Sequence, residues 1–223
     1  MEERKFVGIR KEEFGIKEFI KKEFGKGKIS GVKIEYTPVG ERVIISTHKP
    51  GLIIGKRGES IERLTEILKK KFKMENPRVD IAEVKNPDLD AQIIADDIAL
   101  SMERFGSLRF KSIAYRALTK VKAAGALGTE IVLAGRLPSE RAKRWRFKFG
   151  YLRKTGDAAN DVDYAESRGL DKQGIVGIKV SILSPETFKT EEVTVNEELL
   201  GKLKINLSTI EDKKTKTKKE TKK

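Results

Sequence analysis

The tetrapeptide Gly55-Lys56-Arg57-Gly58 joins two glycines to two adjacent cations, a pattern that suits contact with phosphate. Glycine adopts backbone conformations that are closed to other residues, so the main chain can come close to a sugar-phosphate group. Lys56 and Arg57 would supply positive charge, and a helix beginning near Gly58 would point its N-terminal dipole at the same anion. This stretch is therefore a candidate phosphate-binding loop.

A nucleotide-binding loop is one alternative for this stretch, but its spacing does not fit. A Walker A loop needs four residues between its glycines and a Ser or Thr after its lysine. Three residues separate Gly51 from Gly55, and Arg57 stands where the hydroxyl is required. The dinucleotide fingerprint fails as well, because no acidic residue is placed to bind a ribose. The spacing favours the phosphates of a nucleic acid.

The basic segment 136–154 is a second candidate site, with eight Lys or Arg residues and one acid. From Arg144 to Phe149 cations and aromatic residues alternate strictly, which predicts a strand with one cationic and one aromatic face. We expect the aromatic face to pack into a core rather than stack on bases, and the cationic face to bind phosphate. The cations of this predicted patch are Arg136, Arg141, Lys143, Arg144, Arg146 and Lys148.

A third group of cations lies in residues 107–128, which hold five Lys or Arg residues and no acid. Apolar spacing predicts a helix over 107–124, in which Arg109, Arg116 and Lys120 form one stripe beside the apolar arc. We expect this stripe to face RNA.

Groups for catalysis or metal binding are scarce. His48 is the only histidine and there is no cysteine, so thiolate zinc sites and most nucleophile–histidine pairs are excluded. We interpret Asp157, Asp161 and Asp163 as loop residues rather than as a divalent-cation site. No catalytic residue, metal or cofactor is expected.

The overall charge also indicates a polyanionic partner. The chain has 223 residues, and 48 Lys and Arg against 34 Asp and Glu give a net charge of +14. Such an excess favours nucleic acid or an anionic membrane surface. No run is apolar enough to cross a membrane, and the opening residues lack the apolar core of a secretory signal. We therefore expect an intracellular protein.

Hydrophobic periodicity, glycines and prolines predict the elements that position these residues. The predicted helices span 13–24, 59–72, 88–104 and 107–124, with Asp88 as a helix N-cap. The predicted strands span 32–36, 43–45, 79–81, 130–134, 144–151 and 173–183. Residues after about 211 are too polar to build a core.

The order of the first elements gives the glycine loop a specific context. A GXXG tetrapeptide alone is a common turn, but after two strands and before an amphipathic helix it is the signature of a KH module, which clamps about four nucleotides. The arrangement resembles the type II KH domain, with Gly55, Lys56, Arg57 and Gly58 as its RNA-binding loop. Ile53 and Ile54 are expected to anchor this loop to the core.

Further segments extend the resemblance over roughly residues 5–185. GVKIEYTPVGERVIIST, PGLIIGKRG, GTEIVLAGRL with RAKRWRF, and QGIVGIKVSIL resemble the universal protein-three family of the small ribosomal subunit, in its archaeal and eukaryotic branch. The resemblance implies an α+β fold with an N-terminal type II KH domain of order α-β-β-α-α-β over 1–86. It also implies a C-terminal α/β domain over 87–190, with two helices packed on a mainly four-stranded sheet. An extension over 191–223 would be disordered and rich in lysine from about 211.

The resemblance also implies a function. Members of this family sit in the head of the small subunit in the cytoplasm, bind its ribosomal RNA and line the channel through which mRNA enters. Their basic residues at that channel correspond to Arg141, Lys143 and Arg144. The implied partners are ribosomal RNA, mRNA and neighbouring head proteins of the ten and fourteen families, with no membrane.

Two other functions compete with a structural ribosomal role. A free-standing KH regulator would bind particular transcripts, but it would not need a second basic domain. An enzyme acting on nucleic acid could use Lys56 or a lysine of 136–154 as its nucleophile, but few perturbable catalytic groups are available to support it. We therefore favour a structural ribosomal protein.

The charge pattern predicts a steep salt dependence of RNA binding. If the contacts are mainly to phosphate, affinity for ribosomal RNA fragments should fall by roughly 0.7–0.9 log units per contact for each tenfold rise in salt. Filter binding or fluorescence anisotropy over a salt series measures this slope. An affinity that stays flat across the series would contradict the phosphate-binding hypothesis.

Overall fold

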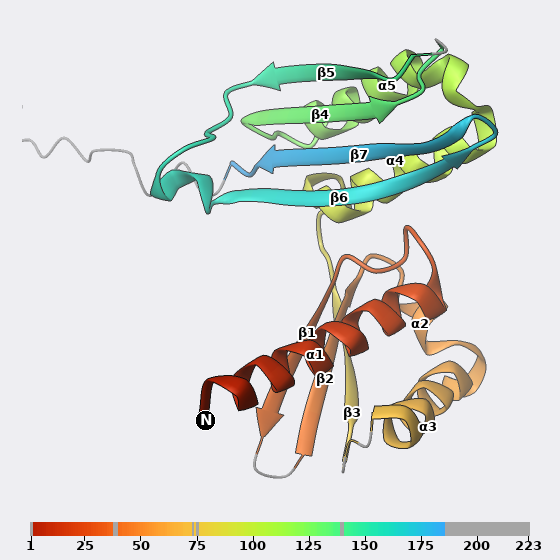
Figure 1. Ribbon diagram of the computed structural model, residues 1–223, viewed down its shortest axis with the longest axis vertical. Helices are drawn as coiled ribbons and strands as arrows, with labels where there is room; N and C mark the ends of the chain where they lie inside the picture. Colours follow the sequence, from red (N-terminus) through yellow and green to blue (C-terminus); the bar gives the residue numbers. More distant parts are fainter. Residues whose placement is uncertain (1, 38–39, 73, 75, 139–140, 186–223) are drawn as a thin grey trace, which may run out of the picture. The chain divides into compact units, whose positions relative to one another are not determined.

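The computed structural model describes residues 2–37, 40–72, 74, 76–138 and 141–185 (Figure 1). The fold is α+β, as predicted, and each of its two sheets packs against helices that supply a separate hydrophobic core. The extension predicted over 191–223 lies outside the described residues.

The N-terminal region has the element order that the sequence predicts for a type II KH domain. Its strands form a three-stranded sheet in the order β1-β2-β3, with β1 antiparallel and β3 parallel to β2. Buried side chains such as Ile20, Ile45 and Leu68 join helices and sheet into one core. The elements are α1 (Glu2–Phe24), β1 (Gly31–Thr37), β2 (Gly40–Thr47), α2 (Pro50–Ile54), α3 (Glu59–Phe72) and β3 (Arg78–Glu83).

Helix α1 begins at Glu2 and not near Glu13, so the predicted start is wrong by about three turns. The apolar stripe that predicted the helix, with Ile16 and Ile20, is the part that packs into the core. Phe6 and Val7 are exposed, at 68% and 54% of their surface. Because these residues do not extend the buried stripe, their spacing did not signal a helix.

The C-terminal region is a four-stranded antiparallel sheet in the order β5-β4-β7-β6. Helices α4 and α5 both cover the same face of this sheet (Figure 1). The elements are α4 (Ala91–Phe105), α5 (Phe110–Ala123), β4 (Gly128–Gly135), β5 (Lys143–Gly150), β6 (Val162–Asp171) and β7 (Gly174–Leu183).

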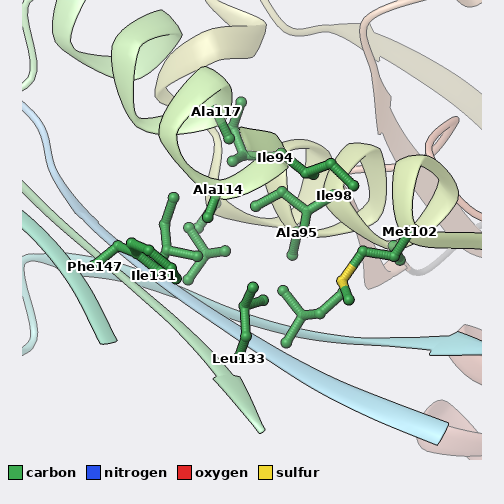
Figure 2. Close-up of a cluster of buried hydrophobic side chains, with 14 of the residues drawn as sticks. Ile94, Ala95, Ile98, Met102, Ala114, Ala117, Ile131, Leu133 and Phe147 are labelled. Carbon is green, nitrogen blue, oxygen red and sulfur yellow. The ribbon is translucent and has the colours of Figure 1, made fainter. Parts of the chain in front are cut away.

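The core of this region lies between the two helices and the sheet. Small residues of the helices let the backbones approach closely, and branched side chains of β4 fill the remaining space. Figure 2 shows Ile94, Ala95, Ile98 and Met102 of α4 and Ala114 and Ala117 of α5 beside Ile131, Leu133 and Phe147 of the sheet.

Two local predictions for this region are wrong. Pro87–Leu89 forms a short 3-10 turn, so the N-cap of α4 is Asp90, whose side chain accepts hydrogen bonds from the N–H groups of Gln92 and Ile93. Strand β6 was not predicted, and Asp163 belongs to it rather than to a loop. Its helix-facing side chains are small and α4 packs close to them: a Cβ at Gly169 would be in ordinary contact, 3.5 Å from the carbonyl oxygen of Ala99.

A buried carboxylate on α4 ties three segments together. Asp96 is 7% exposed, and its oxygens accept hydrogen bonds from the Gly27 N–H at 2.9 Å and the Ser167 hydroxyl at 2.7 Å. The side-chain amide of Gln92 donates a third bond at 3.1 Å. A buried polar group of this kind is stabilising only while its donors are matched.

Replacing Asp96 with alanine should therefore lower the free energy of unfolding by about 2–3 kcal/mol, because buried donors lose their acceptor. Asp97→Ala is the matched control, since Asp97 is half-exposed and pairs with Lys120 at the surface. The control should cost less than about 1 kcal/mol. Urea unfolding followed by circular dichroism measures both values, and equal values would show that Asp96 is not a structural centre.

Candidate nucleic-acid interface

Strand β2 and helix α2 place the glycine loop at the edge of the N-terminal core. Thr47 ends β2 fully buried, and its hydroxyl donates to the Lys28 carbonyl at 2.6 Å and accepts from the Lys49 N–H at 3.1 Å. Pro50 then starts α2, where its missing N–H costs nothing. The loop is thus held at a defined distance from the sheet.

Gly55 ends α2 at a position where only glycine fits. Its φ is +73°, and its N–H bonds to the Gly51 carbonyl at 3.1 Å. A Cβ at Gly55 would lie 2.3 Å from the Ser60 hydroxyl oxygen, which is shorter than any real contact. The first glycine of the GXXG loop is therefore a steric requirement of the turn into α3.

The two cations of the loop are displayed to solvent. Lys56 and Arg57 are both exposed, and Arg57 has a left-handed backbone with φ 54° and ψ 21°. For a residue with a Cβ this conformation costs roughly 1–2 kcal/mol. The loop therefore keeps Arg57 in an unfavourable backbone state that turns its side chain outward, beside Gly58 at φ +84°.

The start of α3 adds less positive potential than predicted. Its first turn carries Glu59 and Glu62, whose carboxylates compete with any incoming anion for the helix N-terminus. Attraction of phosphate at the loop must therefore come mainly from Lys56 and Arg57.

The surface next to the loop is apolar in part. Ile53 is buried as predicted, but Ile54 is 38% exposed, so only the first of these two isoleucines anchors the loop. Leu52, 53% exposed, borders a groove of about 210 Å³ between the end of α1 and α3. Ser60 and Arg63 line the same groove, so polar and apolar surfaces meet beside the GXXG loop.

The alternation predicted for β5 is confirmed. Phe147 is buried and packs on Phe110 with ring centres 6.4 Å apart, and Trp145 packs on the same ring at 5.3 Å. Phe149 is half-buried beneath the Lys122 ammonium. The aromatic face therefore belongs to the core, as expected, and the six predicted cations are all exposed: Arg136, Arg141, Lys143, Arg144, Arg146 and Lys148.

The exposed cations do not all share one face of β5. Arg144, Arg146 and Lys148 alternate with the aromatic residues and project away from the helices. Lys143 lies on the aromatic side, at the end of the strand where it pairs with Gly135. Consecutive residues Lys143 and Arg144 thus present positive charge on both sides of the strand end.

A buried carboxylate that was not predicted lies beneath this patch. Glu130 of β4 is 7% exposed, forms an ion pair with Arg146 at 2.9 Å and another with Lys154. In the sequence, the position of Glu130 inside the apolar run of β4 could have indicated a buried, paired carboxylate. Because of this pair, Arg146 is partly neutralised.

Only part of the basic stripe predicted on α5 is present as an unpaired basic surface on that helix. Arg109 lies in the short 3-10 turn before the helix, while Arg116 and Lys120 are exposed on α5. Lys120 forms an ion pair with Asp97 at 3.1 Å. Contact of this stripe with RNA stays a prediction.

The residues that the structure describes hold neither a metal-ligand cluster nor a membrane-spanning helix. That part of the chain contains no group of three or more His, Asp or Glu side chains arranged to hold a metal ion. Within the same residues, none of the helices combines the length and the apolar character needed to cross a membrane.

Reversing the two charges of the loop should weaken RNA binding without unfolding the domain. Lys56→Asp with Arg57→Asp should leave the melting temperature nearly unchanged, because both side chains are exposed and Asp tolerates the left-handed backbone at 57. RNA binding by the segment 1–85, which contains the whole N-terminal core, should weaken strongly. Anisotropy with a labelled single-stranded RNA measures the change.

Lys33→Glu with Arg78→Glu reverses the same number of exposed charges on the strands of that segment and should bind RNA nearly as the unmodified segment does. Equal weakening in both variants would mean that the loop makes no specific contribution.

Comparison with known proteins agrees with both regions of the fold. The family described as "KH domain" matches residues 15–89, and the family described as "Ribosomal protein S3, C-terminal domain" matches residues 98–182. A protein of Methanocaldococcus jannaschii named small ribosomal subunit protein uS3 is 38% identical over 199 residues, which cover 89% of this chain and 95% of that protein.

Proteins with the same name occur among other relatives. The one from Methanococcus maripaludis is 34% identical, over 92% of this chain and 95% of its own length. The one from Natronomonas pharaonis is 32% identical, over 89% of this chain and 65% of its own length. Two matching domains in the right order, together with identity over most of the chain, place this protein in the uS3 family of small ribosomal subunit proteins.

Proposed function

We propose that this protein lines the channel through which mRNA enters the small ribosomal subunit, with the cations at the start of β5 in contact with the incoming message. The uS3 family is one of structural ribosomal proteins without enzymatic activity, so RNA binding in the ribosome is the general function of the chain. The contact with mRNA is the specific part of the proposal.

The observation that carries this proposal is the exposure of Arg141, Lys143 and Arg144 beside a strand that is anchored by aromatic residues. Arginine and lysine side chains bind phosphate without reading bases, which suits a message of any sequence. Because β5 is fixed against α5, the cations extend from a rigid support while their long side chains remain adaptable.

The opposite orientations of Lys143 and Arg144 support a second part of the proposal, which is contact with both strands of an mRNA duplex. Their side chains leave opposite sides of the strand end, so two polyanionic strands can each meet positive charge. Cations arranged in this way would hold the separated strands of an mRNA duplex as translocation pulls on it.

The remaining basic surfaces are proposed to contact ribosomal RNA. The GXXG loop, Arg109 in the turn before α5 and Arg116 on α5 are exposed and face away from their own cores. Neighbouring head proteins of the ten and fourteen families are proposed partners of the same chain, in the ribosomes of the cytoplasm.

Substituting alanine at Arg141, Lys143 and Arg144 tests the mRNA contact. Subunit assembly should remain largely intact, because the loop and α5 surfaces are unchanged. Translation through a stable mRNA hairpin should slow markedly, while unstructured mRNA should be translated nearly as before. Elongation on matched messages with and without the hairpin gives the measurement.

A triple variant with alanine at Lys85, Arg104 and Lys172 is the control, since it removes three exposed cations outside the proposed contact. Equal slowing of the test variant on both messages would indicate an assembly defect, and no slowing on either message would remove these residues from the channel.

A further inference from the structure

The face of the β5-β4-β7-β6 sheet that points away from α4 and α5 is covered by no helix within the described residues (Figure 1). Contacts on both sides of the sheet assign its side chains. Ser167 points to the helices, because its hydroxyl bonds to Asp96 of α4. Glu166 therefore points to the other face, where Lys179 of β7 reaches it at 2.7 Å. We call this other face, with Arg144, Arg168 and the residues between them, the open face.

Strand register brings cations from the two edge strands into one row. Arg144 of β5 is opposite Ala134, Ala134 is opposite Gly177, and Gly177 is opposite Arg168 of β6. With neighbouring strands about 4.8 Å apart, the two arginine backbones lie roughly 14 Å from each other. Between them the row has only a methyl group and a glycine, so a chain can lie flat on the sheet with an arginine at each side.

Charge on the open face is positive. The carboxylates of Glu130 and Glu166 are each held by cations of the same face, Arg146 with Lys154 in the first case and Lys179 in the second. The hydrogen bond from Lys179 keeps the pKa of Glu166 below its ordinary value, so this ion pair is charged near neutral pH.

Three cations remain after these pairs are formed. Among the described residues, Arg144, Lys148 and Arg168 are exposed and make no ion-pair contact, although Arg168 is near enough to Glu166 to help lower the pKa of that carboxylate. An extended polyanion is therefore the complement of this surface.

Exposed apolar and aromatic side chains lie beside the arginine row. Leu170 and Ile175 form a directly opposed pair, exposed at 63% and 60%, next to Arg168. Tyr164, two rows away in the other direction, is 53% exposed. Cations that follow a backbone, with an aromatic ring within reach, are the combination that binds single-stranded nucleic acid.

We propose that the open face binds single-stranded RNA across its strands, with phosphates at Arg144 and Arg168 and a base stacked on Tyr164. This inference rests on the proposed contact of β5 with RNA and extends it over β7 to β6, which no comparison assigns to RNA. An acidic protein segment is the competing occupant, and the test below distinguishes the two.

Arg168→Gln in the full chain tests the proposal, with a fluorescent oligouridylate as the probe. The fold should be preserved, because the Arg168 side chain is exposed and its carbonyl still accepts the hydrogen bond from Lys26. Affinity should fall, and the slope of log affinity against log salt should become shallower by roughly 0.7, the value for one lost phosphate contact on a single strand.

Two matched variants complete the measurement. Arg104→Gln removes one exposed cation at the end of α4, on the helix side of the sheet, and should leave affinity and slope unchanged. Arg168→Lys keeps the charge and should recover most of the binding. Photochemical cross-linking of the uridines should give an adduct on the peptide that contains Tyr164.

The outcomes separate this inference from the proposed function. If Arg168→Gln binds as the unmodified chain does, while the variant at Arg141, Lys143 and Arg144 binds weakly, the open face is not an RNA surface but the β5 contact stands. If polyglutamate displaces the oligouridylate at equal charge and loses affinity equally in Arg168→Gln, an acidic protein is the occupant. Either result would overturn the proposal.

Discussion

Packing of the β5 aromatic side chains against α5 determines where the C-terminal domain displays its charge. Phe147 and Trp145 lie on the Phe110 ring, and the Tyr115 ring meets Phe147 edge-on. Because side chains alternate along a strand, this contact forces Arg144, Arg146 and Lys148 to the opposite face. Loss of the aromatic contact would therefore disorganise the cationic surface even though no cation had been changed. The core and the basic surface are two sides of one strand.

The N-terminal domain reaches a comparable result through the backbone rather than through side chains. Gly55 has no room for a Cβ beside Ser60, and Arg57 is held in a left-handed conformation. Such strain persists only where the surrounding structure compensates for it, and here α2, α3 and the buried Thr47 do so. The loop is therefore prepared for a ligand before the ligand arrives. Little further ordering would be needed on binding, which favours affinity.

Much of this arrangement could be predicted from the sequence, and the failures have physical causes. Hydrophobic periodicity placed the GXXG loop between two strands and a helix. The strict alternation of cations and aromatic residues predicted both faces of β5. Strand β6 was not predicted because its buried positions, Ala165, Ser167 and Gly169, are small residues without the β-branched character of a typical strand. Because β6 was not predicted, Arg168 was not assigned to a strand face either. Glu130 could not be assigned a partner, since Arg146 and Lys154 reach it only through tertiary structure.

The carboxylates beneath the basic surfaces affect how long a bound strand would remain. A phosphate that reaches Arg146 must take the place of Glu130, and one that reaches Lys179 must displace Glu166. Each such step exchanges one anion for another, and at the buried Glu130 it would leave the carboxylate paired with Lys154 alone, so the net gain from binding at that cation is reduced. If RNA binds this surface as proposed, the acidic partners would weaken its hold at Arg146 and Lys179 relative to the unpaired cations. A sheet with the same cations and no acidic residues would bind RNA more tightly and slow its movement.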